Sequence, residues 1–102
     1  MTDLEMTKLC AEAAGIKICE QHSHYWPQYF DGGIGDCGKD VRYDPLHDDA
    51  QAMALVKKFT LQVWMPVNGV WEAIWPHHAK ARSESINRAI VECVAKMQAA
   101  KP

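Results

Sequence analysis

Four side chains in the first half of the chain are of types that bind zinc, whose preferred protein ligands are cysteine sulfur and histidine nitrogen. They are Cys19, His22, His24 and Cys37. Structural zinc sites usually space their ligands in close pairs, and here only Cys19 and His22 have that spacing. The pattern therefore favours exposed histidines and unpaired thiols, and we expect no cofactor. A zinc-stabilised loop is kept as an alternative.

The glycine-rich stretch GIGDCGKD, residues 33–40, resembles two phosphate-binding motifs. Its first six residues match the pattern G-x-G-x-x-G of dinucleotide-binding folds, and the whole stretch is one residue away from the phosphate loop, with Asp40 in place of the required hydroxyl residue. Both motifs need a strand before the glycines and a helix after them to aim the backbone amides. The residues on either side predict neither, so we interpret the stretch as a glycine-rich loop.

Catalytic motifs have no support elsewhere in the sequence. His77 and His78 lack the glutamate spacing of the H-E-x-x-H zinc proteases. Ser23, Ser83 and Ser85 do not lie in a G-x-S-x-G nucleophile elbow. The chain is therefore predicted not to be an enzyme.

Aromatic side chains are the strongest indication of binding, because large aromatic residues often anchor protein interfaces. The predicted partner-binding residues are Tyr25, Trp26, Tyr29, Phe30, Trp64, Trp71 and Trp75. The three last tryptophans could instead stack on nucleic-acid bases, helped by a basic C-terminal helix. Basic residues are absent from the two strands that carry these tryptophans, which favours a protein partner over nucleic acid.

The elements that position these residues must fit into one domain, residues 1–102, because a shorter unit would bury too little apolar surface. Apolar residues make up 48% of the chain and charged residues 24%, a globular composition. The net charge of −2 argues against a nucleic-acid binder that relies on bulk charge and against a strongly acidic mimic of nucleic acid. No apolar run suggests a membrane span or a signal peptide, so we expect a cytoplasmic protein without a membrane partner.

Three helices are predicted. Thr2 and Glu5 have the spacing of a capping box, and Gly15 is placed to end that first helix. A second helix is expected from about Asp48 to Phe59, and a third from near Ser83, with apolar residues at helical spacing. Cysteines 10 and 93 fall on apolar helix faces, which indicates reduced, buried thiols.

Strands are predicted between the helices. Residues 16–19 read as a short strand, and residues 20–43 as a long loop that could contain another at 41–43. Strands 60–67 and 70–76 form a hairpin around Asn68 and Gly69, which suit a type I′ turn. Continuous pairing from Val67 and Val70 would give an aliphatic face (Leu61, Val63, Met65, Val70, Ile74) and an aromatic face (Trp64, Trp71, Trp75).

The predicted fold class is α+β, in the order helix, strand, helix, strand, strand, helix. Three helices pack on a small, mainly antiparallel sheet in a layered α/β/α sandwich, with a helix also expected over the tryptophan face.

One segment resembles a known family. YDPLHDDAQAMALVKKF, residues 43–59, is similar to the W-x-P-L-x-D-D signature, followed by a helix, of small phage proteins with a phage-type α/β/α sandwich domain. Pro45, Leu46, Asp48 and Asp49 match the signature, and Tyr43 stands in the place of its tryptophan. Residues 86–97 resemble the closing helix of that family. The resemblance implies a phage or prophage origin and no assigned enzymatic activity, and no site residues are carried over.

Together these observations predict a small non-enzymatic phage or prophage accessory protein. It is expected to act in the host cytoplasm, as a monomer or homodimer, by binding a host or phage protein. Inhibition of a host defence system, in the manner of anti-CRISPR proteins, is one activity of this kind. The alternatives are a nucleic-acid-binding module that uses Trp64, Trp71 and Trp75, and the zinc-stabilised loop.

Overall fold

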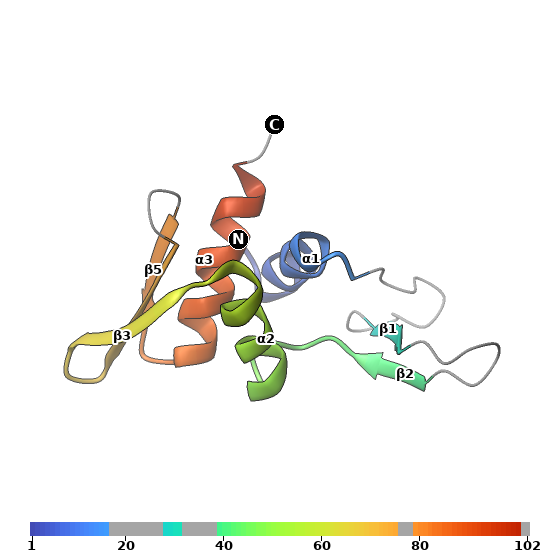
Figure 1. Ribbon diagram of the computed structural model, residues 1–102, viewed down its shortest axis with the longest axis horizontal. Coiled ribbons are helices and arrows are strands. Elements are labelled where there is room, and N and C mark those ends of the chain that lie inside the picture. Colours follow the sequence, from blue (N-terminus) through green and yellow to red (C-terminus); the bar gives the residue numbers. More distant parts are fainter. Residues whose placement is uncertain (17–27, 32–38, 76–78, 101–102) are drawn as a thin grey trace.

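A computed structural model of the chain describes residues 1–16, 28–31, 39–75 and 79–100 (Figure 1). Its helices and strands, in chain order, are α1 (Asp3–Ala14), β1 (Gln28–Asp31), β2 (Lys39–Arg42), α2 (Asp49–Phe59), β3 (Gln62–Val67), β4 (Val70–Trp75), β5 (Ala79–Ser83) and α3 (Ile86–Ala99). Strands β3, β4 and β5 form an antiparallel sheet in that order, and β1 pairs with β2. The predicted α+β class, with helices packed on an antiparallel sheet, is confirmed.

Local capping determines where the helices begin and end. The Thr2 hydroxyl accepts a hydrogen bond from the Glu5 amide at 3.1 Å, and Gly15 adopts the left-handed conformation (φ 74°) that closes α1. Asp48 caps α2 by accepting from the Gln51 amide at 3.0 Å. Ser85 caps α3 in the same way, so this helix begins at Ile86. The predicted first and second helices are confirmed, and so is the third, which begins slightly later than expected.

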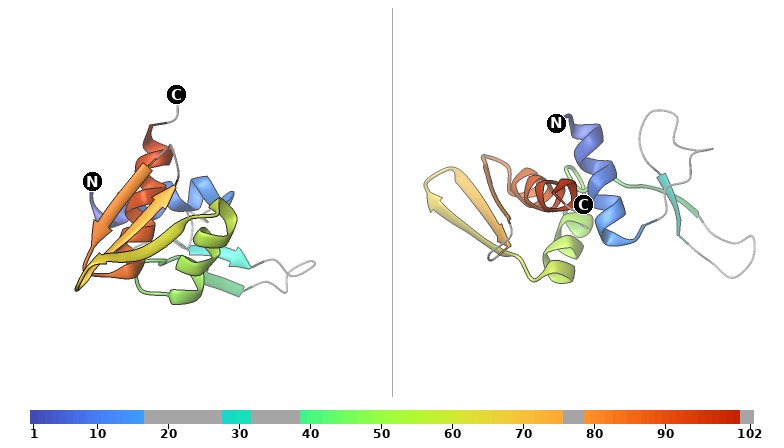
Figure 2. Two further views of the ribbon diagram at one scale, coloured as in Figure 1. Left: turned by 60° about the vertical axis from the view of Figure 1, so that its left-hand side comes forward. Right: turned by 90° about the horizontal axis from the view of Figure 1, so that it is seen from above.

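Helix α3 is the centre of the fold. It packs on β4 and β5 on one side and against α1 on the other, and α2 also contacts it (Figure 2). Its buried residues are Ala89, Ile90, Val91, Cys93, Val94, Ala95 and Met97. A helix that is apolar on most of its circumference must be enclosed by neighbours, as α3 is here. The layers therefore run from the sheet through α3 to α1, whereas we expected helical layers on both faces of the sheet.

The two cysteines of this region behave as predicted from their helical positions. Cys10 on α1 and Cys93 on α3 are both buried and free. The Cys10 thiol donates a weak hydrogen bond to the Val91 carbonyl (Sγ···O 3.4 Å). Burial, and secondarily the neighbouring Cys93, raises the pKa of Cys10 to about 12. Both thiols are therefore protonated parts of the core.

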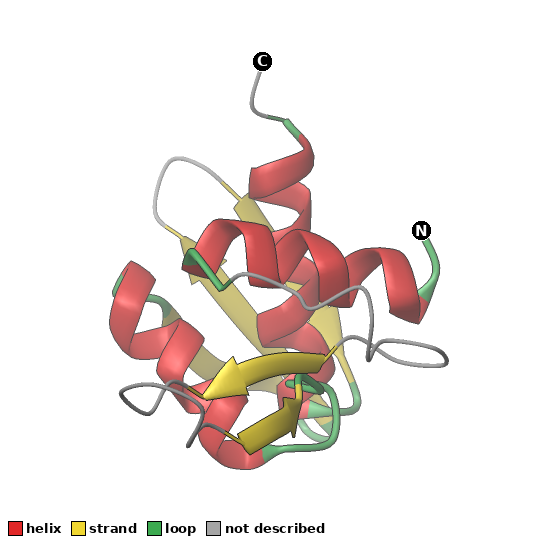
Figure 3. Ribbon diagram, turned by 90° about the vertical axis from the view of Figure 1, so that its right-hand side faces the viewer, coloured by secondary structure: helices red, strands yellow, loops and turns green. Residues whose placement is uncertain are grey.

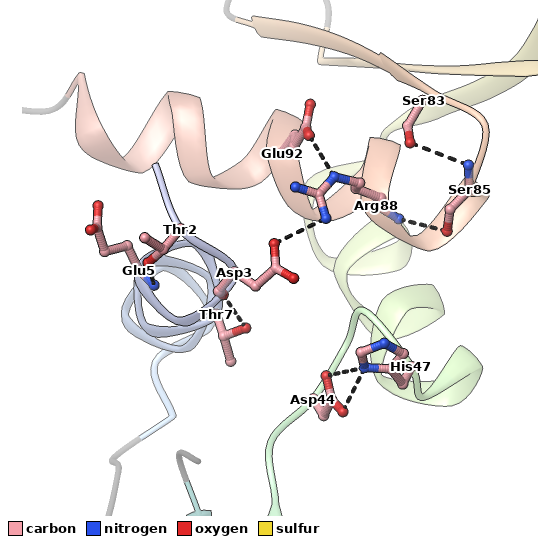
Figure 4. Close-up of polar contacts among 10 residues, drawn as sticks. All are labelled: Thr2, Asp3, Glu5, Thr7, Asp44, His47, Ser83, Ser85, Arg88 and Glu92. Carbon is pink, nitrogen blue, oxygen red and sulfur yellow. Dashed lines mark hydrogen bonds and ion pairs between the residues drawn. The ribbon is translucent and has the colours of Figure 1, made fainter. Parts of the chain in front are cut away.

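An ion pair ties the start of α1 to α3. The Arg88 guanidinium contacts the Asp3 carboxylate through Nη1 at 2.9 Å and the Glu92 carboxylate through Nε at 3.0 Å (Figure 4). The hydrogen bond to Asp3 is the main reason that the pKa of Arg88 is raised. These contacts help to fix the angle at which α1 crosses α3.

The hairpin β3–β4 departs from the predicted register. Val67 pairs with Val70 across the Asn68–Gly69 turn as predicted, but of the two central residues only Gly69 has a positive φ (84°). A type I′ turn requires a positive φ at Asn68 as well, so the predicted turn type is wrong although its position is right. Beyond the turn, however, Trp64 pairs with Glu72, so Met65 and Pro66 together lie opposite the single residue Trp71. This is a β-bulge. Proline has no N–H to donate to a ladder, which explains why the bulge includes Pro66.

The bulge makes the predicted faces of the hairpin wrong. It moves Trp64 to the face opposite Trp71 and Trp75, and those two tryptophans pack against the core beside α3. Ala73 and Ala81, which are paired and buried, lie on this inner face. Their small side chains allow α3 to approach the sheet closely.

Two strands lie in the segment that was expected to be a loop. β1 and β2 pair from Gln28 with Arg42 to Asp31 with Lys39, and Figure 3 shows this ribbon in front of the helices. The strand expected at 41–43 is thus found slightly earlier, at 39–42. The strand expected at 16–19 is not seen at Ile16, which belongs to no element, and its other residues lie outside the described part of the chain.

Candidate functional site

The candidate site is the face of the β3–β4–β5 sheet that points away from α3, called the outer face below. Residues paired across strands share a face of a sheet. The outer face therefore carries three rows, formed by Gln62, Ile74 and Lys80, by Trp64, Glu72 and Arg82, and by Val67 and Val70. Figure 2 shows the sheet with α3 behind it, and no described element covers the outer face.

Exposed apolar side chains gather on strand β3. Within the described residues, the exposed large hydrophobic side chains are Met1, Leu4, Met53, Trp64, Met65 and Val67. Three of these six belong to one short strand, with exposed fractions of 50% for Trp64, 41% for Met65 and 56% for Val67. Scattered exposed hydrophobics are ordinary, whereas grouped ones are typical of interaction surfaces, which makes this strand a candidate site.

A buried carboxylate lies beneath this apolar group. Glu72 is only 3% exposed, although it is on the outer face. Its Oε1 accepts a hydrogen bond from the Trp64 indole Nε1 at 2.9 Å, and its Oε2 accepts one from Arg82 Nε. The Arg82 hydrogen bond is the main reason that the pKa of Glu72 is lowered, so the carboxylate is charged at neutral pH. Both oxygens therefore have charge-stabilising partners.

This network orients the two exposed side chains above Glu72. The indole of Trp64 is held by its N–H, so one ring edge points into the sheet and half of its surface faces solvent. Arg82 is held through Nε while its side chain remains 57% exposed. The site thus combines an aromatic ring and a guanidinium group, the two side-chain types that most often dominate binding energy at interfaces.

The predicted site residues are not brought together as expected. Trp64 lies on the outer face, whereas Trp71 and Trp75 are partly buried on the inner face, where Trp75 contacts Phe59 with ring centroids 5.0 Å apart. A single surface formed by all three tryptophans is therefore ruled out. The bulge at Met65 and Pro66 separates them.

The aromatic residues of the earlier segment are described only in part. Tyr29 and Phe30 lie on β1, paired with Val41 and Asp40, and their backbone alone is described. Tyr25 and Trp26 lie outside the described residues.

The zinc candidates also lie outside the described part of the chain. They are Cys19, His22, His24 and Cys37. Among the residues that the structure does describe, no group of three histidine, cysteine or acidic side chains could hold a metal ion.

Two residues of the site, Glu72 and Arg82, were not predicted from the sequence. Their contact depends on β5, which was not expected because its sequence AKARS contains no β-branched or aromatic residue. A weak signal was present: Ala79 and Ala81 alternate with Lys80 and Arg82, as a strand with one buried and one exposed face requires.

A second polar cluster lies just before α2 (Figure 4). The carboxylate of Asp44, which is 8% exposed, contacts His47 Nδ1 at 2.9 and 3.1 Å. The Asp44 amide donates to Gln51 Oε1 at 2.6 Å, and Gln51 Nε2 donates to the Arg42 carbonyl at 2.9 Å. Aspartate also orients histidine in catalytic triads. Here these bonds close the turn that leads into the helix, and no third acidic, histidine or cysteine side chain of the described residues completes a metal-binding group.

A shallow apolar pocket lies between α1 and α2. Its lining residues are Ala14, Ile16, Tyr43, Gln51, Ala54, Leu55 and Lys58. It has no cluster of titratable groups and lies apart from the outer face.

The described residues thus define an α+β domain with one sheet face covered by α3 and the other uncovered. Comparison with known proteins finds no matching family model, no matching curated protein and no matching solved structure. The resemblance to phage sandwich proteins therefore stays a prediction. No helix of the described residues is both long and apolar enough to cross a membrane.

Proposed function

We propose that this chain is a small non-enzymatic protein that acts by binding another protein through the outer face of its β3–β4–β5 sheet. The observation that carries the proposal is the exposure of Trp64 and Val67 in neighbouring rows of the outer face, on a sheet whose opposite face packs against the core. Binding sites on rigid strands lose little conformational entropy when a partner docks. The hydrogen-bonded indole of Trp64 is the central anchor of this surface.

The biological setting that we propose is a phage or prophage, with a host or phage protein as the partner and the host cytoplasm as the place of action. The similarity of residues 43–59 to the phage signature supports this origin. Inhibition of a host defence protein would fit a domain that offers a binding face but no metal-binding cluster among the residues described.

The proposal can be tested with charged substitutions at two exposed apolar residues. Val67→Glu places a carboxylate on the outer face, whereas Met53→Glu places one on the solvent side of α2, where Met53 is 46% exposed. Both variants and the wild type would be used to capture partners from host lysate, and the partner would then be purified and its affinity measured. We expect Val67→Glu to lose the partner and Met53→Glu to keep it. Equal affinities for the two variants would refute the proposal.

A nucleic-acid-binding module is the second candidate, and one observation favours it. Strand β5 places Lys80 and Arg82 beside the exposed Trp64, so basic residues absent from the hairpin are supplied by its neighbour. Against it, Trp64 alone among the tryptophans of the described sheet is exposed, and stacking on successive bases uses several aromatics. Titration with single-stranded oligonucleotides at low salt decides between them, because phosphate contacts are strongest there.

A further inference from the structure

We infer that the partner presents an acidic segment to the outer face, with carboxylate groups next to an apolar side chain. The inference rests on the proposed function and specifies the chemistry of the partner. It is carried by the charges of the three strands, which contain only three ionisable residues, Glu72, Lys80 and Arg82.

The positive charges of this face exceed its negative charge and are more accessible. Glu72 is buried, and its two oxygens already accept hydrogen bonds from Trp64 and Arg82. Lys80 and Arg82 are exposed and belong to adjacent outer rows. The outer face is therefore locally positive in a chain whose net charge is −2. Such a surface attracts carboxylates and repels basic partners.

The guanidinium of Arg82 is set to receive one more carboxylate. Arginine has five N–H donors in a fixed planar fork, and Glu72 takes the one on Nε. The pair of terminal nitrogens remains, and within the described residues these have no hydrogen-bond partner. Because Glu72 holds Nε, the guanidinium plane is fixed before the partner arrives, and the two terminal nitrogens can bind a carboxylate in a bidentate manner.

The apolar side chains next to these cations define the other half of the partner segment. Trp64 lies in the same row as Arg82, and Val67 and Val70 form the next row toward the turn. A partner segment that presents acidic and apolar side chains on the same side would place carboxylates over Lys80 and Arg82 and apolar groups over Trp64 and Val67. A nucleic-acid strand would instead leave the aliphatic part of this surface without a complementary group.

Selection from a random peptide library reveals this preference even while the natural partner is unidentified. The immobilised wild-type protein would be the bait, and Val67→Glu would serve for counter-selection, so that only outer-face binders are enriched. We expect the enriched peptides to be acidic and to contain aromatic or large aliphatic residues. Neutral or basic enriched peptides that still fail to bind Val67→Glu would overturn the inference and leave the proposed function standing. No enrichment over Val67→Glu would count against both.

Two matched charge reversals then test whether the positive charge of the outer face contributes to the binding of an enriched peptide. Lys80→Glu changes the outer face, and Lys8→Glu makes the same change on the exposed side of α1. We expect Lys80→Glu to weaken binding about tenfold, since like charges are then opposed, and Lys8→Glu to leave the affinity unchanged. Equal loss in both would show that only total charge matters, which overturns the inference.

Arg82→Lys keeps the charge of the outer face but removes the planar fork. A fall in affinity about as large as that of Lys80→Glu is expected if binding is bidentate. Wild-type affinity in this variant would overturn the role of the arginine fork. The melting temperature of each variant shows whether it is folded, so that lost binding is not mistaken for unfolding.

Two further measurements test the other molecules that could bind the outer face, namely nucleic acid and a second copy of the chain. A random single-stranded oligonucleotide that binds more tightly than the enriched peptide would overturn the protein assignment in favour of nucleic acid. Sedimentation that shows a dimer in the wild type but a monomer in Val67→Glu would overturn it in favour of a second copy of the chain. A wild-type monomer, and weaker binding of the oligonucleotide, support an acidic protein segment.

Discussion

The two faces of the β3–β4–β5 sheet differ in packing although they are made by the same three strands. The inner face, which includes Trp71 and Trp75, packs against the core, and the outer face does not. The inner face presents small side chains, Ala73 and Ala81, to helix α3, and both are almost completely buried. The outer face presents Trp64, which is half exposed, above a buried Glu72. The sheet thus has small side chains where it contacts α3. On the outer face, which no described helix covers, it has the large ring of Trp64.

This difference separates the residues that specify the fold from those that are available for binding. The inner face needs small side chains because the sheet and α3 must approach closely, and protein cores tolerate little change in volume. The outer face needs no such fit to keep the chain folded. Its exposed ring, its oriented guanidinium and its apolar strand therefore call for another explanation, and the proposed binding to a partner is one that can be tested.

The largest effect is expected for the two buried thiols of the core around α3, which should be protected from alkylation. Cys10 and Cys93 are buried, and the Cys10 thiol has a pKa of about 12. We expect their alkylation in the native protein to be slower than in the unfolded protein by a factor of about a thousand or more, because it requires opening of the core. Peptide-level mass spectrometry after timed iodoacetamide treatment, with a urea-unfolded control, measures both rates. Similar rates would show that the core around α3 is not sealed.

The same thiol predicts how stability changes with alkaline pH. The folded pKa of Cys10 lies above its ordinary value of 9.0, so the folded state disfavours the thiolate. The corresponding contribution to stability is complete below pH 9.0 and is lost as the pH rises from 9.0 toward about 12. Urea unfolding across this range should therefore show a falling midpoint, and Cys10→Ala should reduce the slope. An unchanged slope would exclude Cys10 as its cause.

An enlarged side chain on the inner face should destabilise the fold more than one on the outer face. Ala73→Leu inserts extra carbon atoms between β4 and α3 and is expected to lower the free energy of unfolding by about 1–3 kcal/mol. Gln62→Leu adds a leucine to the outer face and should change the free energy of unfolding by less than about 0.5 kcal/mol. Chemical denaturation of both variants measures the difference. Equal losses would contradict the contrast between the faces.

The elements whose signals are local could be predicted from the sequence. The cap at Thr2, the left-handed Gly15 and the position of the tight turn at Asn68 and Gly69 each depend on residues a few positions apart. The buried stripe of α3 follows from helical spacing in the same way. These features agree with the prediction because no distant contact decides them.

The layout of the candidate site could not be predicted in this way. Which face Trp64 occupies depends on one extra residue in the bulge, and a shift of one residue moves a strand's side chains to the other side. Glu72 and Arg82 meet only because β4 pairs with β5, which is a contact between separate strands. Trp64 was therefore identified from its residue type, while its partners were found only in three dimensions.

The hydrogen bonds of Glu72 on the outer face should make a smaller contribution to stability, and this contribution should be lost at acidic pH. The folded pKa of Glu72 lies below its ordinary value of 4.5, chiefly because of the Arg82 hydrogen bond. Its contribution is therefore present above pH 4.5 and is lost as the pH falls through the folded value. Glu72→Gln should lower the urea midpoint at pH 7 and weaken its decline in acid. Glu92→Gln, which alters a half-buried helical pair, is the control, and an identical acid profile in the two variants would contradict a special role for Glu72.

The smallest effect on stability is expected at Val67, the residue whose substitution tests the proposed binding. Val67 is 56% exposed and is not part of the packed core of the described residues, so Val67→Glu should change the free energy of unfolding by less than about 0.5 kcal/mol. Met53→Glu should behave alike. Thermal denaturation of both variants checks this, and a large loss in Val67→Glu alone would mean that the outer face supports the fold. If both remain stable while only one loses its partner, the exposed strand is retained for binding, because folding does not require it.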